Sequence, residues 1–141
     1  MKAKKLSRSK RQSDEGVKNI VIPDIFVMCE PSRMKVSSGT YYGTPSLVVE
    51  VRSPSTETVD FDYKKILYES CGVKEYIIVL NYLTAVHYVL GADSVYRSTA
   101  CDSAVSRLSQ EGVLTIPSSQ FPELTLTIKS SWFEEFEDVI I

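Results

Sequence analysis

The chain has 141 residues, which suits one compact domain, and 43% of them are hydrophobic, as in an ordinary soluble protein. No apolar run approaches the roughly 18 residues of a membrane span, and no apolar segment follows the basic N-terminus as in a secretory signal, so we expect a cytoplasmic protein with no membrane partner. Three scattered cysteines argue against a disulfide framework or a Cys-rich zinc site, and we expect them in the core.

The formal net charge of −2 hides an uneven distribution. Residues 1–35 carry nine Lys/Arg against four Asp/Glu, whereas residues 36–141 carry seven against fourteen. A basic arm on an acidic body can contact phosphate backbones, and the alternative is a solvated, disordered start. Because residues 1–16 are polar and lack hydrophobic periodicity, we predict a flexible basic tail there and a single domain over residues 17–141.

Beyond the tail, strand and helix patterns alternate. A β-rich run covers residues 19–28, a polar Gly/Ser connection follows, and residues 46–52 are typical of a buried strand. Residues 60–70 fit a helix, with Ser55 or Thr56 as its N-cap and Gly72 as its C-terminal stop.

The second half of the chain returns to strand patterns. The predicted elements are a hairpin of residues 75–80 and 85–90, a weaker strand at 95–99, two short strands at 113–116 and 124–128, and a short helix at 132–136. This order predicts an α/β domain built on a mixed β-sheet.

Two carboxylates interrupt apolar strands. Asp24 follows Pro23 within the first run, and Glu50 lies within the buried run of residues 46–52. An ionised carboxylate in a sheet is costly unless it is paired, and two on neighbouring strands suit a hard divalent cation. Strand alternation places Glu50 and Arg52 on one face. The alternative is that each carboxylate bonds only to the backbone or to Arg52.

One face of the predicted helix carries three polar side chains. Asp60, Lys64 and Tyr68 lie at i, i+4 and i+8, and a short connection would bring this face back over the sheet, near the carboxylates. Lys64 could instead form a surface pair with Asp60, worth about 0.3–0.5 kcal/mol. Tyr68 could serve packing or catalysis.

Other enzyme classes lack their sequence signals. His87 is the only histidine, and no nucleophile-elbow pattern accompanies it, which argues against a Ser–His–Asp hydrolase. No Gly-rich phosphate loop is present, which argues against a nucleotide-binding NTPase.

Five ordered blocks resemble the Uma-type family of restriction endonucleases, a branch of the PD-(D/E)XK nucleases. The blocks are residues 22–25 (IPDI), 43–51 (GTPSLVVEV), 53–56 (SPST), the spacing Asp60-x3-Lys64-x3-Tyr68, and residues 72–76 (GVKEY). The resemblance is detailed over residues 19–90 and looser beyond. It implies a restriction-endonuclease-like mixed β-sheet flanked by helices and Mg²⁺-assisted (or Mn²⁺-assisted) hydrolysis of DNA phosphodiester bonds.

By this resemblance Asp24 and Glu50 are the metal ligands, and the family's lysine, displaced from the strand to the helix, falls at Lys64. We expect the backbone carbonyl of Val51 and water molecules to complete an octahedral set of oxygen ligands. At position 52 the family is commonly aliphatic, so Arg52 is a departure, and we assign it a possible role in stabilising phosphate charge.

A second departure is that this sequence has only the basic tail where the family usually has an additional helix and strands, and two alternatives to an active nuclease therefore stay open. One is a catalytically impaired nuclease-fold protein that binds nucleic acid or a partner subunit, and the other is an interaction domain without nucleic-acid function. An uncovered sheet edge would favour a homodimer.

Overall fold

The computed structural model describes residues 20–35, 37–52, 58–81, 84–102, 113–129 and 131. The predicted tail of residues 1–16 and the predicted helix of residues 132–136 lie outside these ranges. The elements are β1 (Ile25–Val27), a 3-10 turn η1 (Pro31–Arg33), β2 (Met34–Lys35), β3 (Thr40–Tyr41), β4 (Leu47–Val51), α1 (Thr58–Ser70), β5 (Glu75–Asn81), β6 (Thr84–Leu90), β7 (Tyr96–Asp102), β8 (Val113–Pro117) and β9 (Thr125–Lys129).

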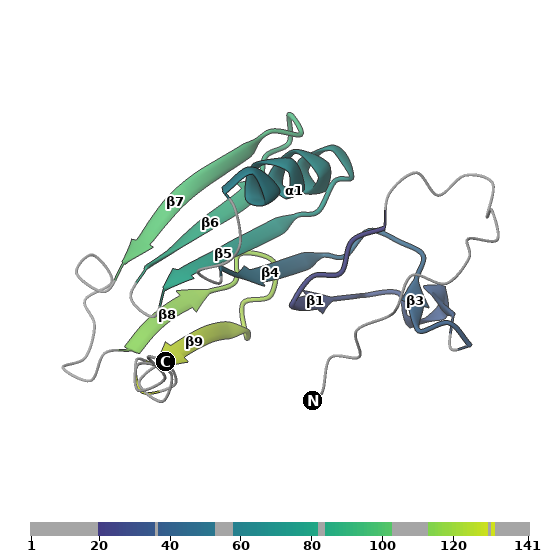
Figure 1. Ribbon diagram of the computed structural model, residues 1–141, viewed down its shortest axis with the longest axis horizontal. Helices are drawn as coiled ribbons and strands as arrows, with labels where there is room; N and C mark the ends of the chain where they lie inside the picture. The colour runs from purple at the N-terminus through teal and green to yellow at the C-terminus, as the bar shows by residue number, and fades with distance from the viewer. Residues whose placement is uncertain are drawn as a thin grey trace, which may run out of the picture.

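A five-stranded sheet in the order β1-β4-β5-β6-β7 forms the centre of the domain (Figure 1). β4 and β5 are parallel, and α1 makes the crossover between them, whereas the other neighbours pair antiparallel. Two small ribbons, β2–β3 and β8–β9, complete the described structure. The predicted mixed sheet is therefore confirmed, but the described part of the chain is mostly β-strand, with α1 as its main helix.

Each face of the sheet has its own hydrophobic core, as the alternation along β4 predicts. Val48 packs with Phe61 and Tyr68 beneath α1. Leu47 and Val49 point to the other side, where the β8–β9 hairpin supplies Leu114, Ile116 and Ile128. Figure 1 shows α1 and this hairpin on opposite sides of the sheet. Within the described ranges α1 is the only helix longer than one turn, so a hairpin covers the face where further helices were expected.

Helix α1 ends where glycine permits it. Gly72 has a φ of +78°, and the N–H groups of Gly72 and Val73 return to the carbonyls of Glu69 and Tyr68 at 3.0 Å each. Such a left-handed residue after the last turn closes a helix with satisfied carbonyls. The predicted stop is confirmed, and the chain leaves the helix directly into β5.

Three local expectations were wrong. The first strand is shorter than residues 19–28, so Asp24 lies in a bend just before β1 and not within a strand. The polar connection after β1 contains the β2–β3 ribbon, whose turn includes Gly39 with a φ of +62°. Cys29 and Cys71 are free and exposed, and neither contributes to the core.

Helix α1, which has thirteen residues, is the longest described helix, and no helix in the described ranges is long and apolar enough to cross a bilayer.

Candidate functional site

Asp24, in the bend just before β1, lies beside Glu50 of the adjacent strand β4. Ile25 pairs with Val49 in the antiparallel β1–β4 ladder, so the next position along brings Asp24 beside Glu50. The backbone N–H of Val51 donates to Asp24 Oδ2 at 2.7 Å, which ties the bend before β1 to the end of β4. The alternative reading, in which Asp24 bonds to the backbone, is thus partly correct, but this bond also holds Asp24 next to the second carboxylate.

Helix α1 supplies two donors to Glu50. Lys64 Nζ donates to Glu50 Oε2 at 3.1 Å, and the Tyr68 hydroxyl donates to Glu50 Oε1 at 2.9 Å. Glu50 is only 4% exposed, so these bonds replace the water that the carboxylate has lost. The Lys64 side chain is 18% exposed, so it is not the surface lysine that the alternative assumed. The side chain of Asp60 lies outside the described structure.

The local electrostatics favour a cation between the two carboxylates. Burial raises the pKa of Glu50, and the negative charge of Asp24 raises it further, while the hydrogen bonds from Tyr68 and Lys64 act in the opposite direction. Repulsion from a second carboxylate is relieved when a positive ion binds both. A divalent cation bound here would therefore replace the repulsion between Asp24 and Glu50 with an attraction of each carboxylate to the cation.

The donor set suits a hard metal that keeps much of its water. Both carboxylates retain unused lone pairs, because each carboxylate oxygen accepts up to two hydrogen bonds. Within the described residues no group of three or more His, Cys, Asp and Glu side chains is arranged to hold a metal. Two carboxylates match Mg²⁺, which is often held by one or two carboxylates plus water and substrate phosphate. The predicted contribution of the Val51 carbonyl stays a prediction.

The other two cations lie apart from Glu50. Arg52 follows β4, its side chain is exposed, and its backbone N–H donates to the carbonyl of Val79 at 2.8 Å. Lys65 lies about 100° further round α1 than Lys64, which by sequence predicts that it points into solvent, but this prediction is wrong. Lys65 is half-buried, and its Nζ lies 5.5 Å from the centre of the Tyr88 ring. Of the three candidate cations, Lys64 is the one that an ion pair joins to Glu50.

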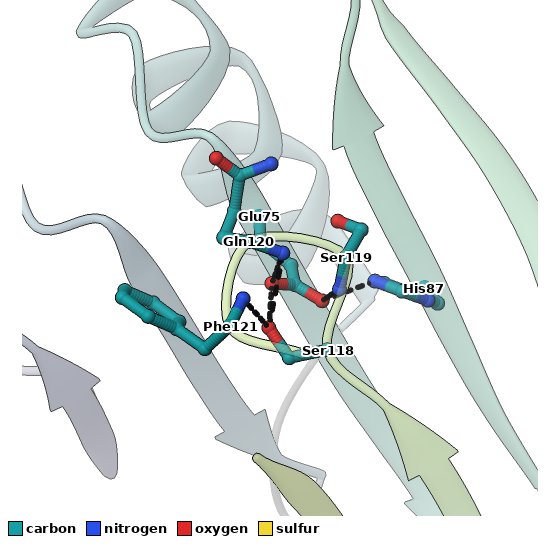
Figure 2. Close-up of polar contacts among 6 residues, drawn as sticks. All are labelled: Glu75, His87, Ser118, Ser119, Gln120 and Phe121. Carbon is teal, nitrogen blue, oxygen red and sulfur yellow. Dashed lines mark hydrogen bonds and ion pairs between the residues drawn. The ribbon is translucent and has the colours of Figure 1, made fainter. Parts of the chain in front are cut away.

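A second buried carboxylate was missed by the sequence analysis. Glu75, at the start of β5, is fully buried on the side of the sheet that the β8–β9 hairpin covers. Its Oε1 lies 2.6 Å from His87 Nε2 and accepts from the Ser119 N–H at 3.0 Å, while its Oε2 accepts from Ser118 Oγ at 2.6 Å and from the Gln120 N–H at 3.3 Å (Figure 2). Both oxygens are thereby saturated.

This cluster holds serine, histidine and glutamate, but its connectivity is not that of a hydrolase. In a catalytic triad the histidine lies between the serine and the acid, so that it can accept the serine proton. Here Glu75 lies between Ser118 and His87, as Figure 2 shows. The cluster therefore anchors the turn between β8 and β9 to β5 and β6. The sequence signal was a glutamate at the start of a predicted strand. It did not reveal the cluster, because the partners of Glu75 lie far away in the sequence.

Comparison with known proteins adds one finding to this geometry. The model of the Uma2 family, described as "Putative restriction endonuclease", matches residues 9–129. A comparison with curated proteins finds no match. The matched segment contains both carboxylates, Lys64 and all the strands of the central sheet.

Proposed function

This chain belongs to the Uma2 family, and from that membership and the Asp24–Glu50 site we propose that it is a divalent-metal-dependent endonuclease that hydrolyses phosphodiester bonds in DNA. Family membership supports a nuclease at the general level. The metal dependence, the DNA substrate and the residue roles are our proposals.

One observation carries the proposal: a carboxylate just before β1 and a carboxylate of the adjacent strand β4 share a site with a lysine from the crossover helix. Asp24 and Glu50 offer the hard oxygen ligands, and Lys64 lies 3.1 Å from Glu50. A divalent cation held there supplies polarisation of the scissile phosphate and activation of the attacking water. We assign the Mg²⁺ or Mn²⁺ ligands to Asp24, Glu50 and the carbonyl of Val51.

We assign separate roles in the reaction to Lys64 and Arg52. Lys64 is close enough to Glu50 to orient an attacking water or to offset the negative charge that develops on the phosphate. Arg52 is exposed one residue beyond β4, and because a guanidinium offers hydrogen-bond donors and no acceptor, it would bind phosphate and not take a proton from water.

Calorimetric titration with Mn²⁺ tests the metal site directly. We expect the wild type to bind Mn²⁺ and the double variant Asp24→Asn, Glu50→Gln to lose that binding, because both ligand charges are removed. Asp62→Asn is the matched control, since Asp62 is an exposed carboxylate of α1 outside the site. Equal Mn²⁺ affinity in the wild type and the double variant would refute the metal assignment.

A catalytically impaired nuclease-fold protein that binds nucleic acid or a partner subunit is the second candidate. The hydrogen bonds that Glu50 already accepts from Lys64 and Tyr68 favour it, because they satisfy the buried carboxylate without a metal. A gel-shift titration in salt without divalent metal, combined with a cleavage assay, separates the two. Salt-sensitive DNA binding without cleavage at saturating Mg²⁺ would support this candidate over the nuclease.

We also propose that the protein works as a cytoplasmic homodimer. β1 is an edge strand of the central sheet, where Ile25 is exposed, and Ile20 and Ile22 just before the strand are exposed as well. An exposed apolar edge is a common site of pairing between chains. The free thiols of Cys29 and Cys71 suit a reducing compartment.

A further inference from the structure

We propose that Tyr68 is a positioning residue for the metal ligand Glu50: its hydroxyl orients the carboxylate so that Glu50 can share a cation with Asp24. This inference rests on the proposed function and goes beyond it, because it assigns a role to a side chain that neither binds the metal nor touches DNA. Metal-binding carboxylates are usually held by a hydrogen bond from a second side chain, and loss of that bond typically lowers metal affinity.

The contact is short, buried and specific. The Tyr68 hydroxyl donates to Glu50 Oε1 at 2.9 Å, and Tyr68 is 3% exposed, so water does not compete for this bond. Lys64 holds the other oxygen from one helical turn earlier. Two donors on one face of α1 therefore fix both ends of the carboxylate, which removes its freedom to rotate.

The orientation matters because the second ligand is itself fixed. The N–H of Val51 holds Asp24 Oδ2 at 2.7 Å, so Asp24 would lose this bond if it moved to follow Glu50. For both carboxylates to hold one cation, Glu50 would therefore have to keep the rotamer that brings it to Asp24. Tyr68 is the donor that holds Oε1 in that rotamer.

Packing in the core would explain why an aromatic ring lies at position 68, but it would not explain why that ring carries a hydroxyl. The Tyr68 ring meets the Tyr76 ring edge-on, with centroids 5.0 Å apart, and both belong to the core beneath α1. Phenylalanine would keep this contact. The hydroxyl is thus the part of the side chain whose removal distinguishes positioning from packing.

Tyr96 provides a matched control within the same core. Its ring packs against Tyr76, and its buried hydroxyl donates to the carbonyl of Val73 at 2.8 Å, away from Glu50. Tyr68→Phe and Tyr96→Phe each remove one buried hydroxyl from the same aromatic cluster. A general loss of stability should affect both variants, whereas a loss of ligand orientation should affect only the first.

The experiment is Mn²⁺ calorimetry on the full chain, with thermal unfolding of each variant recorded in parallel. We expect Tyr68→Phe to lower Mn²⁺ affinity by about 10-fold or more and Tyr96→Phe to leave it within about 2-fold of the wild type. Replacement of Tyr68 by 4-aminophenylalanine, which keeps the ring and restores an N–H donor, should recover most of the affinity and tests the idea even if Tyr68→Phe folds poorly.

The outcomes separate this inference from the proposed function. Equal Mn²⁺ affinity in wild type and Tyr68→Phe, or equal losses in Tyr68→Phe and Tyr96→Phe, would overturn the positioning role while leaving the metal site intact. A wild type that binds no Mn²⁺ would refute the metal site, and the positioning role with it.

Discussion

Replacing Glu75 by glutamine should destabilise the whole domain. The substitution keeps the size of the side chain but puts an NH₂ group where a carboxylate oxygen accepts hydrogen bonds. Four donors converge on that carboxylate: His87, the Ser118 hydroxyl and the N–H groups of Ser119 and Gln120. A glutamine can satisfy only some of them, and its own NH₂ must face at least one donor.

The size of the loss follows from the burial of the cluster. Hydrogen bonds to a charged group contribute roughly 1.5–3 kcal/mol each to stability, and removing one partner of a buried ion pair lowers stability by about 3–5 kcal/mol. Glu75 is fully buried, and glutamine retains one accepting oxygen, so we expect a loss of about 2–4 kcal/mol in the free energy of unfolding. With an m-value of about 2 kcal/mol/M in urea, the midpoint should fall by about 1–2 M.

The pH dependence of this loss has a defined sign. Burial by itself would raise the pKa of Glu75, but the hydrogen bonds from His87, Ser118 and the Ser119 N–H outweigh it, so the pKa is lowered from its usual value of 4.5. A carboxylate with a depressed pKa in the folded state stabilises the fold above its unfolded pKa, and this stabilisation disappears as the pH falls through the folded pKa.

Urea unfolding of wild type and Glu75→Gln at several pH values measures both effects. We expect the largest difference at neutral pH and a smaller one as the pH falls below 4.5, the usual pKa of the glutamate carboxyl. Glu123→Gln is the control, because Glu123 is an exposed carboxylate in the same β8–β9 turn. A difference between wild type and Glu75→Gln that is below about 0.5 kcal/mol at pH 7, or that grows towards acid pH, would refute the anchoring role.

Two further predictions concern activity and assembly. Lys64→Ala should fold, keep DNA binding and lose most turnover in a duplex-cleavage assay. Arg52→Ala should mainly weaken DNA affinity, and Lys65→Ala should cost at most about 1 kcal/mol of stability through its lost contact with Tyr88. If Arg52→Ala abolishes cleavage while Lys64→Ala leaves it intact, the lysine assignment is wrong. Analytical ultracentrifugation should show a dimer that the exposed-edge variant Ile25→Lys dissociates, and a stable wild-type monomer would contradict this expectation.

The residues of the proposed site could be selected from the sequence because their environment there is anomalous. Glu50 interrupts an apolar strand, and strand alternation correctly placed it on the face that α1 covers. The i, i+4 spacing correctly put Lys64 and Tyr68 together, and both reach Glu50. The repeat of a strand or helix determines which of its side chains share a face, so this prediction is correct whenever the strand or helix itself forms.

Features that depend on distant partners could not be predicted in this way. Glu75 meets Ser118 across 43 positions of the chain, and no local pattern reports such a contact. The shortness of β1 has a similar origin, since the Asp24 carboxylate accepts the N–H of Val51 from a bend instead of continuing the ladder. The prediction that the cysteines lie in the core rested on the average burial of cysteine, which does not determine the environment of an individual residue; Cys29 and Cys71 are exposed.

Placement of the Glu50 donors on a helix has a consequence for how this sequence can vary. A residue inserted in α1 between Lys64 and Tyr68 would rotate one of them by ~100° away from Glu50, so the spacing of the pair should resist insertion and deletion. Position 52 contributes its backbone N–H to the sheet, so the fold itself sets no such limit on its side chain and accepts an arginine there. The fold should therefore tolerate sequence change more readily just beyond β4 than along the Lys64–Tyr68 face of α1.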